Sequence, residues 1–275
     1  MEIKKYELTD ETLNYNGYIL HRIKAVRDFG LVRAGDLGGW IEKEDNLSHE
    51  GNCWVYDEAK VYRNAVVKDN AKVFGDAVVY DNAQVFDDAQ VYGYTEVCDN
   101  TKVYGDAQVY GFTEVSDYAQ IYGHANVCGH AKVYGNAKVF GNAWVCDKAK
   151  VYDYARVYGN TDVCGEAEVY ESAQIYDEAE VSGNTKVFGY AQVSGNAVIC
   201  GEAVIKEDKD YAVFKNTWSS GRWFTWTRSN NLWKVGCFYG TGDELIEKAY
   251  ADSKISGKCY KAIVQAQNKI FEVLN

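Results

Sequence analysis

The chain has 275 residues, 47% of them hydrophobic, which is enough for one large globular domain or two smaller ones. Its 29 basic and 40 acidic residues give a net charge of −11, which disfavours nucleic acid and anionic lipid as partners. No apolar stretch approaches the roughly 18 to 20 residues of a membrane span. Residues 1–10 are too charged for a signal peptide, so we expect a cytoplasmic protein with no membrane partner.

The eight cysteines form no CxxC pair and no tight cluster with histidine. This spacing argues against a zinc ribbon and against a disulfide scaffold, so we expect free thiols and no metal site. Proline is absent, whereas Gly, Asn and Asp are abundant. Turns are therefore predicted to use residues that accept a positive φ.

Residues 1–50 have no regular period and contain a glycine-rich turn between Ala34 and Trp40. The segment that follows is a predicted solenoid, and the strand edges at the end of a solenoid need a cover. We therefore predict that residues 1–50 form an N-terminal cap, with Trp40 and Trp54 covering the first coil.

Residues 51–206 carry an internal repeat of six residues. An aliphatic residue stands at every sixth position from Val55 to Ile205, 26 positions in all, and Ala or Thr follows four residues after each of them from Val55 to Ile199. A strict period of six does not fit an α-helix, whose period is about 3.6 residues. We predict that the aliphatic residue points inward from a short strand and that the small residue fills a corner. Three such hexapeptides close one triangular coil, so the segment is predicted to be a parallel β-helix of about eight or nine coils.

The residue after each aliphatic position is usually aromatic, and an offset of 18 residues assigns it to one of three faces. Stacked aromatic ladders are the expected result, because equivalent residues of successive coils are neighbours. On the first face the aromatic residues are replaced by five small residues. These predict a docking face for the C-terminal domain, another subunit or a ligand. The alternative is that the small residues only relieve crowding between side chains of this face. The docking face comprises Cys128, Cys146, Cys164, Ser182 and Cys200.

The repeat matches the pattern [LIV]-[GAED]-X-X-[STAV]-X, so the chain resembles the hexapeptide-repeat proteins, and the resemblance implies a left-handed β-helix. It departs from that family in the aromatic residue that follows the aliphatic one. The segments AVRDFGLVRAGDLGGWIE from Ala25 and GNCWVYD from Gly51 resemble the entry region of the YdcK-like proteins of bacteria and prophages. Similar chains are often carried by phages, which suggests a phage origin.

Residues 207–275 differ in composition, with four tryptophans between Trp218 and Trp233. Three strands are predicted at 211–218, 222–228 and 232–238. Thr241 and Glu244 form a capping box that opens a helix, and a final helix follows. This α+β domain mixes aromatic and cationic side chains in a predicted ligand or partner site, although for most of the tryptophans the core of a small sheet is the favoured alternative. The predicted site consists of Arg222, Trp223, Trp226, Arg228, Trp233 and Lys234.

Many left-handed β-helix proteins are trimeric acyltransferases, and that resemblance implies a histidine general base between subunits. The histidines of the repeat are His124 and His130, which stand at turn positions usually filled by Asn or Asp. No loop interrupts the coils to build a cleft, which counts against catalysis.

Two functional hypotheses follow. The first is a non-catalytic binding or scaffold protein without a cofactor, a homo-oligomer (trimer or dimer) that binds a host protein or sequesters a small anionic, nucleotide-like ligand. The second is an acyltransferase that uses acyl-CoA, with His124 or His130 as base. Exposed aromatics at the corners are predicted subunit contacts. They are Tyr94, Phe112, Tyr118, Tyr154 and Tyr190.

Overall fold

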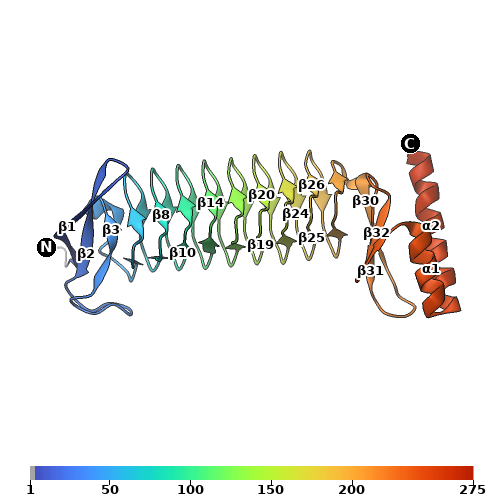
Figure 1. Cartoon of the computed structure of the whole chain (residues 1–275), viewed down its shortest axis with the longest axis horizontal. Helices are drawn as coiled ribbons and strands as arrows, with labels where there is room; N and C mark the ends of the chain where they lie inside the picture. The colour runs from blue at the N-terminus through green and yellow to red at the C-terminus, as the bar shows by residue number, and fades with distance from the viewer. Residues whose placement is uncertain (1–3, 275) are drawn as a thin grey trace.

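The computed structural model describes residues 4–274. In this part of the chain a long parallel β-helix carries an antiparallel cap at its N-terminal end and a sheet with two helices at its C-terminal end (Figure 1). The mainly β fold and the parallel β-helix predicted from the repeat are confirmed.

The β-helix has three faces, each a parallel sheet whose neighbouring strands lie 18 residues apart in the chain. The first face contains β4 (Trp54–Val55), β7 (Lys72–Val73), β10 (Gln90–Gly93), β13 (Gln108–Gly111), β16 (Asn126–Val127), β19 (Trp144–Val145), β22 (Asp162–Val163), β25 (Glu180–Val181) and β28 (Val198–Ile199). The second face contains β5 (Lys60–Val61), β8 (Val78–Val79), β11 (Glu96–Val97), β14 (Glu114–Val115), β17 (Lys132–Val133), β20 (Lys150–Val151), β23 (Glu168–Val169), β26 (Lys186–Val187) and β29 (Val204–Ile205). The third face contains β6 (Val66–Val67), β9 (Gln84–Val85), β12 (Lys102–Val103), β15 (Gln120–Ile121), β18 (Lys138–Val139), β21 (Arg156–Val157), β24 (Gln174–Ile175) and β27 (Gln192–Val193).

The interior of the β-helix is built from the two constant positions of the repeat. The aliphatic residues from Val55 to Ile205 are fully buried, as are the alanines that follow them. Backbone hydrogen bonds join successive coils; for example, the N–H of Tyr104 donates to the carbonyl oxygen of Ile121 over 3.0 Å. Each coil therefore gains its stability mainly from its two neighbours.

The corners use left-handed backbone, as predicted. The φ angle is 59° at Asp81, 71° at Gly105 and 69° at Gly135. An aspartate at this position has a second role, because Asp117 Oδ2 accepts a hydrogen bond from the N–H of Gly135 in the next coil over 2.9 Å.

The predicted aromatic ladders are present on all three faces. The longest lies on the third face, where consecutive ring centroids are 4.8 to 5.3 Å apart and nearly parallel. Its members are Phe86, Tyr104, Tyr122, Phe140, Tyr158 and Tyr176.

The N-terminal segment covers the first coil. Strands β1 (Tyr6–Tyr15), β2 (Tyr18–Ala25) and β3 (Leu37–Ile41) form an antiparallel extension of the second face, and a short 3₁₀ helix, η1 (Glu44–Asn46), follows. Trp40 and Trp54 are 6% and 1% exposed. The buried Lys5 Nζ donates to the carbonyl oxygen of Cys53 over 2.9 Å, which ties the segment to the first coil.

The C-terminal segment follows a second 3₁₀ helix, η2 (Asp208–Asp210). It consists of an antiparallel sheet of β30 (Tyr211–Lys215), β31 (Trp223–Thr227), β32 (Leu232–Val235) and β33 (Phe238–Gly240), followed by helices α1 (Gly242–Asp252) and α2 (Lys254–Leu274). The capping box is confirmed, since the N–H of Glu244 donates to Thr241 Oγ1 and Glu244 accepts from the N–H of Thr241. The predicted strand at 232–238 is instead two strands, because Gly236 turns the chain with a φ of 55°.

The sheet packs against the end of the β-helix and not along the docking face (Figure 1). The N–H of Val198 donates to Thr225 Oγ1 over 2.9 Å, and the Tyr239 hydroxyl donates to the carbonyl oxygen of Cys200 over 3.3 Å. The expectation that this domain covers the five small residues of the docking face was therefore wrong. The physical reason is that the last coil exposes unpaired backbone groups, which the sheet satisfies.

Candidate functional site

The six residues of the predicted C-terminal site do not form one surface. Trp226 and Trp233 are each 1% exposed and form the core of the sheet with Phe224 and Leu245. The indole N–H of Trp226 donates to Asn231 Oδ1 over 2.8 Å, so its polar group is also used internally. For these two tryptophans the core interpretation is correct.

The other members of the predicted site are dispersed. Trp223 is partly exposed on β31 and lies 4.9 Å from the ammonium group of Lys215. Arg228 faces Asp210 at 3.9 Å and packs over the ring of Phe271. Only Arg222 lines a cavity that the structure contains in this domain.

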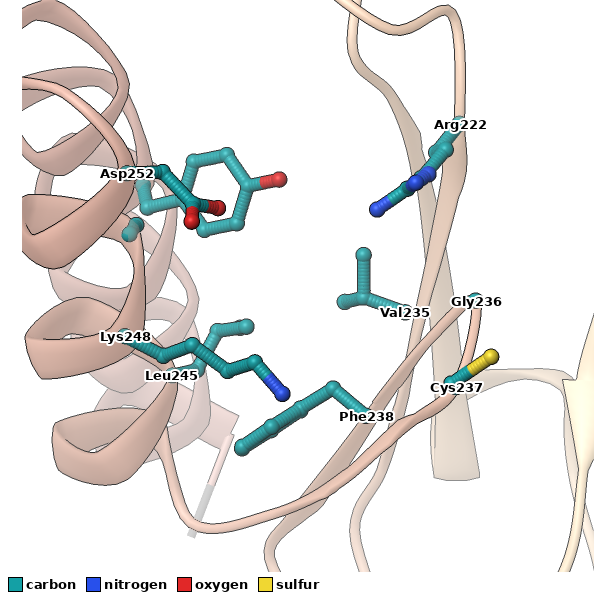
Figure 2. Close-up of a pocket in the computed structure, with 10 residues that line it drawn as sticks. Arg222, Val235, Gly236, Cys237, Phe238, Leu245, Lys248 and Asp252 are labelled. Carbon is teal, nitrogen blue, oxygen red and sulfur yellow. The ribbon is translucent and has the colours of Figure 1, made fainter.

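That cavity has a volume of about 280 Å³ and lies between the turn joining β32 to β33 and helix α1. Its walls are mostly apolar, and two cationic side chains enter it from opposite sides. Figure 2 shows Arg222 reaching in from the sheet and Lys248 from the helix, with Phe238 below. The cavity is lined by Arg222, Val235, Gly236, Cys237, Phe238, Leu245, Lys248, Ala249, Asp252 and Tyr260.

Neither cation of the cavity has an anionic partner in residues 4–274. No ion pair or side-chain hydrogen bond joins Arg222 or Lys248 to an acidic group, Asp252 included, although all three line the same space. Lys248 Nζ lies 5.7 Å from the centroid of the Phe238 ring, a weak cation–π distance. Two unpaired cations beside apolar walls are suited to a small organic anion.

Local sequence explains this geometry. The capping box at Thr241 fixes the start of α1, so Leu245, Lys248, Ala249 and Asp252 fall on one side of the helix at spacings of three, four and seven residues. On the opposite wall, the left-handed backbone at Gly236 makes the turn beside which the Arg222 side chain lies. Sequence reasoning missed Lys248 and Asp252, although the helical spacing after the capping box was a usable signal.

The two histidines of the repeat lie at successive corners, as predicted, and both are exposed. His124 Nδ1 is 3.4 Å from Asp106 Oδ2 of the preceding coil, which is a pairing that could orient an imidazole as a base. His130 instead stacks on Phe112 with ring centroids 5.0 Å apart, and it borders a cavity of about 340 Å³ with Lys132, Lys148 and Lys150.

The docking face is open along most of its length in residues 4–274. The indole N–H of Trp144 donates to Cys128 Sγ over 3.1 Å, so this tryptophan fills space at one end of the face, and Tyr239 contacts Cys200 at the other. Cys146, Asp147 and Cys164 have ligand atoms within 4.8 Å of one another. Burial raises the pKa of Cys146 to about 12 and raises that of Cys164, which keeps both thiols protonated at neutral pH when no metal is bound.

The six-residue repeat and the three stacked parallel faces fit a hexapeptide-repeat β-helix protein, and the resemblance to such proteins implies that the β-helix is left-handed. No protein-family model matches the sequence. Over 74 residues the chain is 38% identical to a protein of Escherichia coli (strain K12) described as "Uncharacterized acetyltransferase YdcK". That match spans 24% of this chain and 23% of YdcK, so it covers less than a quarter of either protein. None of the helices in residues 4–274 is both long and apolar enough to cross a membrane.

Proposed function

We propose that this protein is a non-catalytic binding protein that captures a small organic anion in the C-terminal cavity. The observation that supports this function is the pair of cations, Arg222 and Lys248, which face one partly apolar space and form no ion pair in residues 4–274, so that together they outnumber the single carboxylate there, Asp252. In a protein with a net charge of −11, nearby acids would be expected to neutralise such groups unless a ligand did so.

The size and lining of the cavity limit which kinds of ligand it can hold. Ligand sites of drug size have volumes of roughly 300 to 1,000 Å³, and this cavity is about 280 Å³. The cavity is therefore at the lower end of that range, which favours a ligand smaller than a complete nucleotide. A carboxylate or phosphate joined to one ring or short chain fits better, with its charge between Arg222 and Lys248 and its apolar part on Phe238 and Leu245.

Isothermal titration calorimetry with benzoate, phenyl phosphate and adenosine monophosphate tests this proposal. We expect one of the two smaller anions to bind, and we expect Arg222→Gln or Lys248→Gln to weaken that binding about tenfold, because each removes a charge-assisted contact. Lys234→Gln is the matched control, since Lys234 lies on the same sheet but does not line the cavity. An equal loss in the Lys234 variant, or no binding of any of the three probes, would contradict the proposal.

The resemblance to phage-borne chains suggests a biological role for such binding. A phage protein that binds a small anion would remove that anion from its host, so native mass spectrometry of protein purified from bacterial cells is an informative companion experiment. The same spectrum reports the number of subunits, for which we propose a dimer or trimer.

A second candidate function, acyl transfer from acyl-CoA, is favoured by one contact and one comparison. His124 lies 3.4 Å from Asp106, and the protein that matches 74 residues of this chain is described as an acetyltransferase. In this function His124 would accept the proton of an acceptor hydroxyl or amine as it attacks the thioester carbonyl, and coenzyme A would leave as the thiol.

A thiol-release assay with acetyl-CoA and mixed amine and alcohol acceptors distinguishes the two functions. Under acyl transfer, His124→Asn and Asp106→Asn should each abolish release, while His130→Asn should retain it because His130 stacks on Phe112 and pairs with no carboxylate in residues 4–274. Under the binding function the wild-type protein releases no thiol.

A further inference from the structure

The third face differs from the other two in the charge of its outward strand residues. On the second face, lysines pair with glutamates of neighbouring coils, as in Lys132 with Glu114 at 2.5 Å and Lys150 with Glu168 at 2.9 Å. The third face consists of every third strand from β6 to β27, and none of these eight strands contains an acidic residue. Its cations, Lys102, Lys138 and Arg156, make no ion pair in residues 4–274. Gln120 lies between Lys102 and Lys138, and Arg156 is the next strand residue after Lys138.

The corner that precedes this face carries exposed tyrosines on alternate coils. Tyr118 is 58% and Tyr154 is 65% exposed, and they lie 36 residues, or two coils, apart. Asn136 occupies the coil between them. With strands about 4.8 Å apart, the two rings repeat at roughly 9 to 10 Å along the β-helix.

This spacing leaves the faces of the tyrosine rings available. At the neighbouring corner, Tyr94 and Phe112 stack directly with centroids 5.0 Å apart, so each ring covers the next. No aromatic ring in residues 4–274 stacks on Tyr118 or Tyr154. Their flat faces can therefore receive a ring from outside the protein.

The tyrosines and the cations line one groove. It has a volume of about 460 Å³ and is bordered by Tyr118 and Tyr154 on the corner and by Lys102, Lys138 and Arg156 on the strands, with amide side chains between them. The carboxylate of Asp153, at the same corner, accepts a hydrogen bond from the N–H of Glu171 over 3.1 Å, so it is engaged in holding the coils together.

We propose that this groove binds a linear acidic oligosaccharide that carries one carboxylate on every second sugar. Tyrosine faces at two-coil intervals would pack against the C–H face of alternate sugar rings. Lys102 and Lys138 are also two coils apart, which places a cation at the same interval for each carboxylate, and Arg156, one coil beyond Lys138, would add a second cation to the second carboxylate. The amides of Asn100, Gln120 and Asn136 both donate and accept hydrogen bonds, as sugar hydroxyls require.

Single-stranded nucleic acid is the other polymer with rings and negative charge, and the groove fits it less well. Nucleic acid carries a phosphate on every nucleotide, and binding it relies on many cations and a positive field. Here the groove has only three cations, Lys102, Lys138 and Arg156, together with neutral amides, and the whole chain has a net charge of −11.

The test uses the full chain and hyaluronan oligosaccharides, in which a carboxylate-bearing sugar alternates with an N-acetylated one. Chitin oligosaccharides of the same length supply the neutral comparison, and oligothymidylate supplies the nucleic acid. We expect hyaluronan to bind, and the double variant Tyr118→Ala/Tyr154→Ala to lose about tenfold or more in affinity. The double variant Lys138→Gln/Arg156→Gln should lose a similar factor and also reduce the salt dependence of binding.

Tyr94→Ala is the matched control, because Tyr94 is an equally exposed corner tyrosine, at 61%, that lies outside the groove. Its affinity for hyaluronan should equal that of the wild type. Tighter binding of oligothymidylate than of hyaluronan would assign the groove to nucleic acid and overturn the proposal. Equal binding of chitin, no binding of hyaluronan, or an equal loss in the Tyr94 variant would also overturn it. None of these results bears on the C-terminal cavity, so the two proposals fail independently.

Discussion

Thr161 and Thr95 occupy equivalent corner positions of the repeat and are both fully buried, yet their hydroxyls differ. Thr95 Oγ1 donates to the carbonyl oxygen of Tyr92 over 2.8 Å and lies 3.0 Å from Thr113 Oγ1, with which it shares a hydrogen bond. Thr161 Oγ1 is buried without a hydrogen-bond partner. The same substitution is therefore expected to have opposite effects on stability at these two positions.

Substitution by valine replaces the hydroxyl by a methyl group of nearly the same shape. A buried polar group without a partner costs about 1 to 3 kcal/mol, and an added buried methyl contributes about 0.8 kcal/mol. We expect Thr161→Val to raise the free energy of unfolding by about 1 to 2 kcal/mol. Thr95→Val removes a satisfied hydrogen bond and leaves the Thr113 hydroxyl without that partner, so we expect it to lower the free energy of unfolding by about 1 to 2 kcal/mol.

Thermal unfolding followed by circular dichroism measures both variants against the wild type. A change of 1 kcal/mol shifts Tm by about 2 to 4 °C in a chain of this size. Because repeat proteins can unfold in parts, urea titrations should confirm that the slope of the transition is unchanged. A lower Tm for Thr161→Val, comparable to that of Thr95→Val, would refute the assignment of an unsatisfied hydroxyl at this corner.

Three further predictions concern the whole molecule. Burial raises the pKa of Cys146 and of Tyr110 to about 12, from ordinary values of 9 and 10. The stability that these two protonated groups contribute is therefore complete below pH 9 and is lost as the pH rises toward 12. The Tm should fall across this pH range, and Tyr110→Phe should make the fall shallower. Gly38→Ala should lower the free energy of unfolding by about 1 to 3 kcal/mol, because the new Cβ would lie 2.5 Å from Ile23 and 2.6 Å from Trp54. An unchanged midpoint of urea unfolding would contradict this prediction. Native mass spectrometry should give a dimer or trimer, and a monomer alone would remove the predicted subunit contacts.

The fold of the β-helix is predictable from sequence because one period determines both strand and corner. Val55 and every sixth residue after it are buried, and the small residue four positions later, Ala or Thr, is buried as well. Residues such as Asp81 and Gly105 accept the left-handed backbone that each corner needs. These are local requirements repeated in every coil, so a single sequence contains them many times over.

The candidate sites were harder to predict because they depend on contacts between segments. Composition could not separate the core tryptophans Trp226 and Trp233 from ligand-binding ones, since both roles favour the same side chain. Lys248 joins the cavity only once α1 packs against the turn at Gly236. The unpaired row on the third face, in contrast, could have been read from the sequence, because Lys132 finds its glutamate at an offset of 18 residues and Lys138 does not.

Self-association and oligosaccharide binding can be related through the faces of the β-helix. The docking face from Cys128 to Ser182 lies on the first face, whereas the groove of Tyr118 and Tyr154 borders the third. If copies of the chain pack through the docking face, the groove stays open and glycan affinity is independent of protein concentration. If they pack through the corner tyrosines, assembly and glycan compete for the same rings, and the oligosaccharide dissociates the oligomer. Measuring the subunit count with and without hyaluronan therefore identifies which face the copies share.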